Sequence, residues 1–263
     1  MSRGLIFDSG VGGLSVTADI RARLPELMLD YAADDDFRPY GDKTPAQLEA
    51  RLPGLLWSLR DMLGSDFIVL ACNTASTTAL PAIRAVLDVP VIGVVPAIKP
   101  AAKASQTRRI GVLGTPGTVA HQYVDGLIED YAAGVDVRLQ GSTALVAQAE
   151  AKLAGQAVDM EVIARELAAF KGLMPDVDQI VLACTHFPLL EPELSQIMGS
   201  AVTWVDSGDA IARRVQSVMR EMGLGLSLQP ARQTAFTTGA DIGPTRQRIF
   251  RSYGFDRLVS LSP

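Results

Sequence analysis

The sequence predicts an α/β fold made of two similar units, each with a mainly parallel β-sheet flanked by helices. The first observation is the order of segments, since short β-branched apolar runs alternate with helical patterns and the order restarts after Pro96. The second is a repeat, because Ile-Val-Leu-Ala-Cys occupies residues 68–72 and again residues 180–184. Each copy is typical of a buried parallel strand that ends in a small polar cluster.

The composition narrows the class of protein. With 263 residues the chain is long enough for one large domain or two modest ones. A formal charge of −5 provides no basic surface for nucleic acid or an anionic membrane. No apolar run approaches the roughly 18–20 residues of a spanning helix, and a strand that begins at Gly4 leaves no room for a signal peptide. We therefore expect a cytoplasmic protein with neither a nucleic-acid nor a membrane partner.

The first expected strand, residues 5–7, leads into a glycine-rich segment, residues 8–13, and then into a helix over residues 14–24. Three glycines allow a tight turn whose N–H groups face a ligand. The segment lacks the third glycine of a dinucleotide-binding loop and the lysine of a P-loop, so a nucleotide site is disfavoured. Asp8 either faces a ligand or caps the helix that follows.

The second strand is expected over residues 28–33, with a loop over residues 34–44. Three aspartates, residues 34–36, open this loop without the spacing of a calcium site, and we interpret them as a solvated charge run.

Residues 44–47, Thr-Pro-Ala-Gln, predict the start of a helix that runs toward Leu63. Pro53 is expected to kink or interrupt this helix. A helix through residues 80–87 and a strand over residues 91–95 follow the first cysteine-bearing strand.

The second unit repeats this pattern. Its expected elements are a strand and Gly/Thr loop over residues 109–118, a strand over 135–139, helices around 144–154 and 159–172, the second cysteine-bearing strand, and a strand over 202–205. The segment after Asp209 is expected to hold one helix, residues 211–222, and short strands that complete the first unit.

The only two cysteines, Cys72 and Cys184, each close one copy of the repeat. A disulfide is unusual in a reducing compartment, and no C-x₂-C or H-x₃-H pair predicts a metal site. Two buried spectator thiols are one interpretation, because free cysteine is among the most buried residue types. Paired chemistry is the other, since ligands bind beyond the carboxyl ends of parallel strands, and two similar halves can turn these ends toward one cleft.

Five motifs lie in order between residue 5 and about residue 208. They are residues 7–16 (FDSGVGGLSV), 39–41 (PYG), 71–76 (ACNTAS), 114–118 (GTPGT) and 184–190 (CTHFPLL). Together they closely resemble the motifs of glutamate racemases, which are cofactor-independent members of the aspartate/glutamate racemase superfamily. The resemblance implies two α/β domains, residues 1–97 with 207–263 and residues 98–206, with an active site in the cleft between them.

The resemblance further implies a homodimeric enzyme that interconverts L- and D-glutamate without pyridoxal phosphate and supplies D-glutamate for peptidoglycan. Cys72 and Cys184 match the two proton-transfer residues, Asp8 and His186 match the groups that assist them, and Glu150 matches a supporting glutamate. The residues expected to contact the substrate are Asp8, Ser9, Tyr40, Gly41, Asn73, Thr74, Thr115, Thr118, Thr185 and His186.

The expected chemistry explains why two thiols are needed. Inverting an α-carbon removes a proton from one face and returns one to the other, so one thiol is deprotonated and the other protonated in each direction. The helices expected after Thr74 and after His186 favour the reactive thiolate. Hydroxyl groups and glycine N–H groups would bind the carboxylates and stabilise the carbanion.

Two positions depart from the family pattern. Ser142-Thr143 stand where Cys-Pro commonly precedes the supporting glutamate, and Phe37 stands where an arginine is frequent. His186 favours glutamate, because aspartate racemases more often have Glu at that position. The alternatives are a superfamily racemase for another acid such as aspartate and a non-catalytic acid-binding regulatory protein. A serine hydrolase that uses Ser9, His186 and Asp8 is a further alternative, although the G-x-S-x-G motif is missing.

Overall fold

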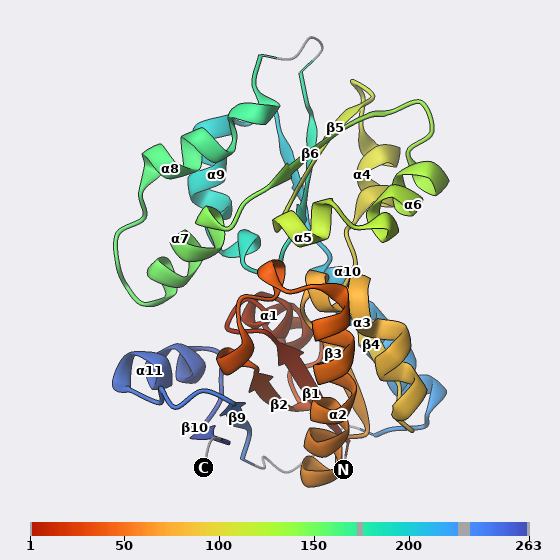
Figure 1. Ribbon diagram of the computed structural model, residues 1–263, viewed down its shortest axis with the longest axis vertical. Coiled ribbons are helices and arrows are strands. Elements are labelled where there is room, and N and C mark those ends of the chain that lie inside the picture. Colours follow the sequence, from red (N-terminus) through yellow and green to blue (C-terminus); the bar gives the residue numbers. More distant parts are fainter. Residues whose placement is uncertain (1, 173–175, 226–231, 262–263) are drawn as a thin grey trace. The chain divides into compact units, whose positions relative to one another are not determined.

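The computed structural model describes residues 2–172, 176–225 and 232–261. The chain divides into two compact units, residues 1–94 with 208–263 (unit 1) and residues 95–207 (unit 2) (Figure 1). Each unit contains one parallel sheet flanked by helices, which confirms the predicted fold class. Among the helices of the described ranges, none has the length and apolar character needed to cross a bilayer.

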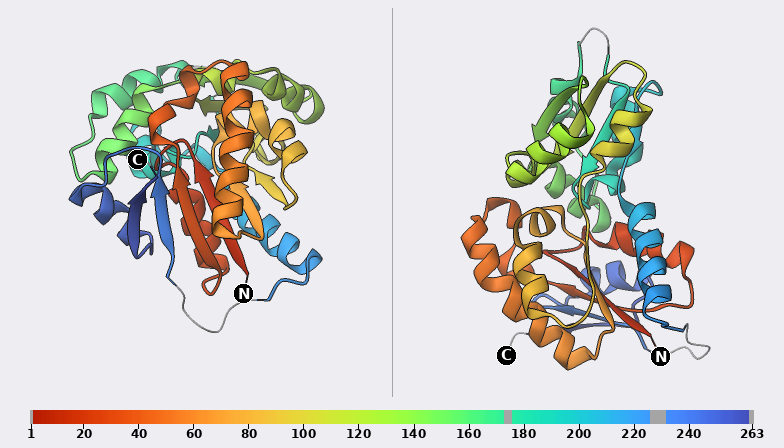
Figure 2. Two further views of the ribbon diagram at one scale, coloured as in Figure 1. Left: turned by 60° about the horizontal axis from the view of Figure 1, so that its bottom comes forward. Right: turned by 90° about the vertical axis from the view of Figure 1, so that its right-hand side faces the viewer.

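Unit 1 contains a six-stranded sheet in the order β10-β9-β2-β1-β3-β4, and all its neighbouring pairs are parallel. Its strands are β1 (Arg3–Asp8), β2 (Met28–Ala33), β3 (Phe67–Leu70), β4 (Val91–Gly93), β9 (Thr234–Thr237) and β10 (Arg257–Ser260). Because β9 pairs with β2, the segment after residue 208 contributes two strands to this sheet. Figure 2 shows the strands of unit 1 with helices on both faces.

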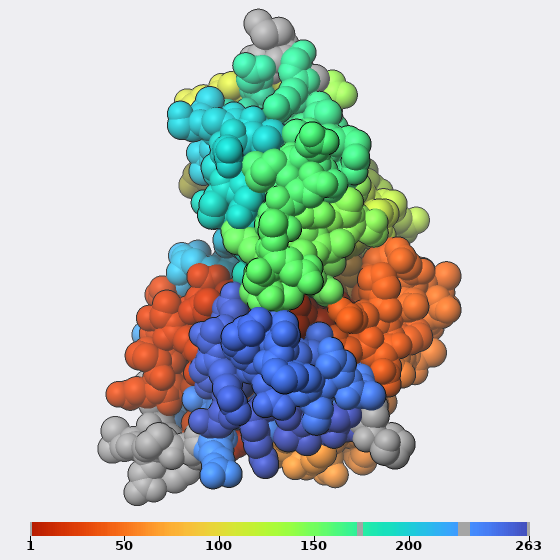
Figure 3. All heavy atoms as spheres, turned by 90° about the vertical axis from the view of Figure 1, so that its left-hand side faces the viewer, coloured from red at the N-terminus to blue at the C-terminus, as the bar shows by residue number. Residues whose placement is uncertain are grey.

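The helices of unit 1 are α1 (Leu14–Arg23), α2 (Pro45–Leu63), α3 (Asn73–Val86), α10 (Gly208–Glu221) and α11 (Pro244–Ser252). Helix α11 was not expected, since the sequence predicted one helix after residue 209. Only Ile249 and Phe250 of this helix are buried, so its apolar periodicity is weak. Phe250 packs against Tyr31 with 5.3 Å between ring centroids, which anchors α11 on the surface of unit 1 (Figure 3, dark blue).

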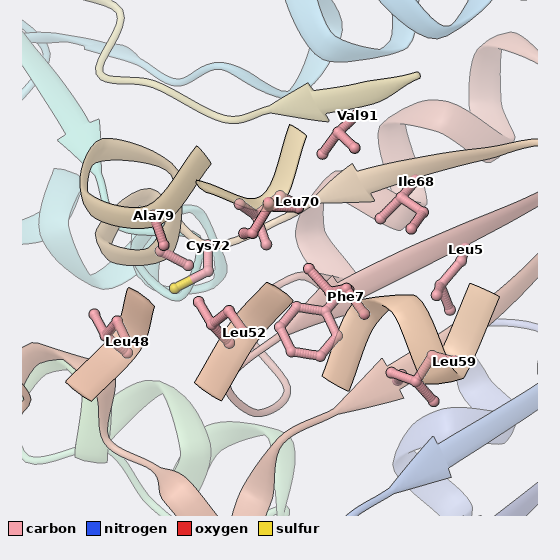
Figure 4. Close-up of a cluster of buried hydrophobic side chains, with 14 of the residues drawn as sticks. Leu5, Phe7, Leu48, Leu52, Leu59, Ile68, Leu70, Cys72, Ala79 and Val91 are labelled. Atoms are coloured by element: carbon pink, nitrogen blue, oxygen red, sulfur yellow. The ribbon is translucent and has the colours of Figure 1, made fainter. Parts of the chain in front are cut away.

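Helix α2 begins with the predicted capping box between Thr44 and Gln47. The prediction of an interruption at Pro53 is wrong, because the helix is continuous from Pro45 to Leu63. Four leucines of α2, Leu48, Leu52, Leu56 and Leu59, are buried against β1 and β3. Figure 4 labels all of these except Leu56. Burying each leucine contributes about 1.5–3 kcal/mol, which together exceeds the cost of about 3 kcal/mol for one helical proline.

Unit 2 contains a four-stranded parallel sheet in the order β6-β5-β7-β8. Its strands are β5 (Arg109–Gly114), β6 (Asp136–Gly141), β7 (Gln179–Ala183) and β8 (Thr203–Val205). Its helices are α4 (Ile98–Ala104), α5 (Pro116–Val119), α6 (Gln122–Tyr131), α7 (Ala144–Leu153), α8 (Met160–Glu166) and α9 (Glu191–Met198). The loop expected after β5 is in part the single turn α5, whose N-cap is Thr115.

Strand register aligns the polar ends of neighbouring strands in both units. In unit 1, Phe7 of β1 pairs with Leu70 of β3, so Asp8 and Cys72 follow at the same edge of the sheet. In unit 2, Gly114 of β5 pairs with Ala183 of β7, so Thr115 and Cys184 follow at the same edge. Each sheet therefore presents its predicted site residues at its carboxyl edge.

Candidate active site

In unit 1 the glycine turn after β1 wraps around the carboxylate of Asp8. Asp8 is fully buried, and its Oδ2 accepts hydrogen bonds from the N–H of Gly13 at 3.0 Å and of Gly10 at 3.2 Å. Gly13 is the N-cap residue of α1, so Asp8 bonds to the residue that opens this helix. The carboxylate thus stabilises the conformation of the glycine turn that surrounds it.

Tyr31 of β2 supports the same turn, although no motif in the sequence marks it as a site residue. Its hydroxyl donates to the carbonyl of Gly10 at 2.9 Å. Burial, followed by the charge of Asp8, raises the pKa of Tyr31 well above its usual value, so the phenol stays neutral and donates. Tyr31 lies in a fully buried strand, so its pattern in the sequence is that of an ordinary core residue.

Cys72 lies between the end of β3 and the start of α3, where it is the N-cap residue. Its side chain lies beside Ala79 and Leu52 in the core cluster of Figure 4, and only 7% of the residue is exposed. The Sγ atom lies 3.9 Å from Oγ of Ser9, which belongs to the glycine turn. Asn73 and Thr74 follow as the buried first residues of α3. The structure therefore brings Ser9 and Cys72 together within unit 1.

Tyr40 and Gly41 lie in a short turn after β2, and Tyr40 belongs to the same buried cluster as Cys72. The Tyr40 hydroxyl donates to Oδ2 of Asp34 at 2.7 Å. Asp34 is fully buried and the side chain of Asp35 is only 8% exposed, and they form ion pairs with Arg51 and Arg246 respectively. The interpretation of these aspartates as solvated charges is therefore wrong for Asp34 and Asp35, and among the three only Asp36 is exposed.

Phe37, one of the two departures from the family pattern, lies beneath two cationic side chains. Arg51 Cζ and Lys43 Nζ each lie 4.8 Å from the centroid of the Phe37 ring. Arg51 of α2 thus places a guanidinium over the ring of Phe37, the residue that stands where the family often has an arginine. Both Phe37 and Arg51 line a surface hollow of about 540 Å³, together with Gln47, Ala50 and Leu55.

In unit 2 three side chains, including the second thiol, contact one another in series. The Sγ of Cys184 lies 3.8 Å from Nδ1 of His186, and Nε2 of His186 lies 3.6 Å from Oε1 of Glu150. Cys184 and His186 are each only 5% exposed, whereas the Glu150 side chain is 32% exposed. The three predicted residues of this group therefore lie close together in the structure.

The second departure from the family pattern is accommodated by helix capping. Ser142 is buried, and its Oγ accepts a hydrogen bond from the N–H of Leu145 at 3.0 Å. This bond caps the first turn of α7, the helix that carries Glu150. A serine at this position therefore stabilises the helix on which the supporting glutamate is expected.

Threonines complete the candidate site in unit 2. The hydroxyl oxygens of Thr115 and Thr118 lie 2.9 Å apart at the start of α5, and Thr185 is buried between Cys184 and His186. Neither thiol forms a disulfide among the described residues. Across the described ranges 2–172, 176–225 and 232–261, no group of three or more His, Cys, Asp or Glu side chains could hold a metal ion.

Comparison with known proteins gives the same family from sequence and from structure. The Asp/Glu/hydantoin racemase family matches residues 12–215. A glutamate racemase of Vibrio vulnificus (strain YJ016) is 49% identical over 218 residues, which cover 83% of this chain and 81% of the relative. A glutamate racemase of Shewanella sp. (strain MR-7) is 42% identical over 263 residues and covers 98% of this chain and 96% of the relative.

Among solved structures, Escherichia coli glutamate racemase in complex with L-glutamate and the activator UDP-MurNAc-ala has a TM-score of 0.93 and 39% identity. The match covers 99% of this chain and 98% of that chain. Picrophilus torridus aspartate racemase, with a TM-score of 0.58 and 18% identity over 86% of this chain and 96% of that chain, shares the fold alone. The chain therefore belongs to the Asp/Glu/hydantoin racemase family and is an amino-acid racemase, which is an isomerase.

Proposed function

We propose that this racemase interconverts L- and D-glutamate by means of two cysteines and without a cofactor. The observation that carries the proposal is that two equivalent strand ends each deliver a buried thiol with a polar side chain beside it. Ser9 Oγ lies 3.9 Å from Sγ of Cys72, and His186 Nδ1 lies 3.8 Å from Sγ of Cys184. Two spectator thiols would not need these polar neighbours.

In the proposed mechanism Cys72 and Cys184 act on opposite faces of one α-carbon. The thiolate of one cysteine takes the α-proton, and the electron pair of the broken C–H bond remains on the substrate as a carbanion. The thiol of the other cysteine then donates its proton to the opposite face, which inverts the centre. In the reverse direction the two cysteines exchange roles.

Each cysteine has an assisting group on its own unit. Asp8 is the last residue of β1, which pairs with the strand that leads to Cys72, and His186 is two residues from Cys184. Oε1 of Glu150 lies 3.6 Å from Nε2 of His186, and Nδ1 on the other side of the ring faces the thiol. The imidazole therefore lies between a carboxylate and Sγ of Cys184, where it can pass a proton to or from the thiol.

The remaining predicted residues bind the two carboxylates and the ammonium group of glutamate. Hydroxyl donors come from Ser9 and from Thr74, Thr115, Thr118 and Thr185, and main-chain N–H groups come from the glycine turn and the first turn of α3. Asn73 Oδ1 is buried, and no donor among the described residues bonds to it. This buried amide oxygen can accept a hydrogen bond from the ammonium group of an amino acid.

Glutamate is the substrate that the comparisons favour. The relatives from Vibrio vulnificus and Shewanella are glutamate racemases, and the Escherichia coli complex contains L-glutamate. That complex also contains UDP-MurNAc-ala, a muramic-acid nucleotide, and this supports the proposal that the D-glutamate is used for peptidoglycan. We extend the proposal to a homodimer, as the family resemblance implies. Light scattering on the purified protein tests that assembly.

The decisive experiment is α-proton exchange in D₂O. Purified protein with a reducing agent and no added cofactor is incubated with L-glutamate, D-glutamate or L-aspartate, and is followed by proton NMR and chiral chromatography. With either glutamate enantiomer, the inverted product should carry deuterium at the α-carbon while the unreacted substrate keeps its proton at early times. L-aspartate should remain unchanged.

Three results would overturn the proposal in different ways. Inversion of aspartate in preference to glutamate would assign another acid substrate within the same family. Early deuterium in the substrate and the product alike would indicate a single base that serves both faces, and the two-cysteine mechanism would then be wrong. If none of the three amino acids shows α-proton exchange or inversion while both thiols are shown to be reduced, the non-catalytic acid-binding alternative is favoured.

A further inference from the structure

We propose that Asp34 and Arg51 are positioning residues for the turn that carries Tyr40 and Gly41, and that Tyr40 serves the substrate through its main chain. The inference rests on the proposed function, in which this turn contacts glutamate. It assigns no substrate contact to the Tyr40 hydroxyl, which bonds to Asp34 instead. Neither Asp34 nor Arg51 was a candidate site residue in the sequence.

Asp34 accepts hydrogen bonds on both carboxylate oxygens from three different parts of unit 1. Its Oδ1 accepts from Arg51 Nη2 at 2.6 Å and from Thr238 Oγ1 at 2.8 Å. Its Oδ2 accepts from Arg51 Nε at 2.7 Å and from the Tyr40 hydroxyl at 2.7 Å. Asp34 is also fixed through its main chain, since its N–H donates to the carbonyl of Asp8 at 2.9 Å.

A fully buried carboxylate needs this set of donors because burial of an unpaired charge is strongly unfavourable. The two bonds from Arg51 are parallel and bidentate, which fixes direction as well as distance. The hydrogen bonds to Asp34 raise the pKa of Arg51, so the guanidinium stays charged. Stacking over Phe37 holds the other side of the same guanidinium.

The Tyr40 hydroxyl has one proton, and that proton points to Asp34. Burial raises the pKa of this hydroxyl far above its usual value, and the charge of Asp34 raises it further, so the phenol is neutral. A neutral phenol that donates to Asp34 has no second proton for a substrate carboxylate. The ring and the hydroxyl therefore anchor the turn in the core, and the main chain of Tyr40 and Gly41 is the part left to meet the substrate.

The test is a double-mutant cycle on the full chain, read as kcat and KM for L-glutamate. Tyr40→Phe removes the donor, and Asp34→Asn removes the charged acceptor. A positioning role predicts that each substitution raises KM by about 10-fold with kcat changed less than 3-fold, because the turn binds ground state and transition state alike. The double variant should resemble the more affected single variant, since both changes break the same bond.

Two further variants control for folding. Asp30→Asn is the matched control, because Asp30 is also fully buried on β2 and ion-paired to an arginine, Arg3, but does not reach Tyr40. It should lower the melting temperature and leave KM unchanged. Arg51→Lys keeps a positive charge beside Asp34 while removing the guanidinium fork, so it should fold and raise KM by about 3-fold.

The outcomes separate this inference from the proposed function. If the wild-type protein leaves both glutamate enantiomers unchanged, the proposed function is wrong and the inference falls with it. If the wild-type protein racemises glutamate but the KM effects of Tyr40→Phe and Asp34→Asn multiply in the double variant, the hydroxyl contacts the substrate independently. In that case only the positioning role is wrong. If Asp30→Asn raises KM as much as Tyr40→Phe and Asp34→Asn do, the rise in KM is due to general destabilisation, and the positioning role is wrong.

Discussion

Oε1 of Glu150 lies 3.6 Å from Nε2 of His186, and the ring nitrogen on the other side of the imidazole lies 3.8 Å from the thiol of Cys184. A partly exposed carboxylate on α7 is thus connected through one imidazole to a buried sulfur. In the proposed mechanism this order of carboxylate, imidazole and thiol lets the carboxylate orient the ring toward the sulfur.

Replacing Glu150 by glutamine should lower kcat by about 10- to 100-fold and change KM little, because the carboxylate acts through His186 rather than on the substrate. Steady-state kinetics in both directions measure this effect. Glu193→Gln is the matched control, since Glu193 pairs with Lys152 at 2.7 Å outside this chain of residues. An unchanged kcat in Glu150→Gln would remove Glu150 from the mechanism.

Replacing either cysteine by serine should reduce racemisation by at least about 10³-fold, because a hydroxyl is a far weaker acid than a thiol at neutral pH. Each variant should still exchange the α-proton of the one enantiomer that faces its remaining thiol. Exchange in D₂O, followed by NMR, should therefore select opposite enantiomers in Cys72→Ser and Cys184→Ser. Near-normal turnover by either variant contradicts the two-base assignment.

Adding one methyl group at Gly13 should disrupt the turn around Asp8. A Cβ there would lie 2.9 Å from Oη of Tyr31 and 3.0 Å from the Cβ atoms of Ala71 and Asp8. Gly13→Ala should therefore destabilise the protein by about 1–3 kcal/mol and lower activity, as measured by urea unfolding and turnover.

Gly54→Ala provides the control for that substitution. Gly54 lies within α2, and no atom would come within 4 Å of an added Cβ. The change should stabilise the protein by about 0.5–1 kcal/mol, because alanine is the better helix former. Equal stability of the two variants would mean that the packing around Gly13 tolerates a methyl group.

Stability should depend on pH through Asp178. Burial raises the pKa of this carboxyl, but hydrogen bonds from the Ser105 hydroxyl and from the N–H groups of Gln106 and Thr107 outweigh it, so the net pKa is lowered. A carboxyl with a lowered pKa in the folded state stabilises the protein above its unfolded pKa of about 4, and this contribution is lost as pH falls through the folded value.

Asp178→Asn should therefore lower the free energy of unfolding at pH 7 by no more than about 1 kcal/mol, because solvent screens this partly exposed carboxylate, and the deficit should shrink as pH falls below about 4. Urea unfolding of both proteins between pH 3 and pH 7 measures it. Asp61→Asn, at an exposed position of α2, should show no such difference. A deficit that stays constant with pH would mean that the charge of Asp178 does not contribute.

The sequence alone determined most of the strands and the location of both cysteines at strand ends. Strands such as β2 and helix starts such as that of α2 depend on short-range patterns, which are complete within a few residues. The motifs around Asp8, Cys72 and Cys184 are also local, and they were enough to identify the family. The roles assigned to these residues remain proposals.

Only the tertiary structure decided which charges are buried and which polar groups meet. Asp34 resembled a solvated residue because two of its donors, Arg51 and Thr238, are 17 and 204 positions away. The continuity of α2 through Pro53 similarly depends on leucines packed against distant strands. The physical reason is the same in both cases. The free energy of burying a charge, or of keeping a proline within a helix, depends on the hydrogen-bonding and packing partners that the fold supplies. Those partners lie outside the local sequence.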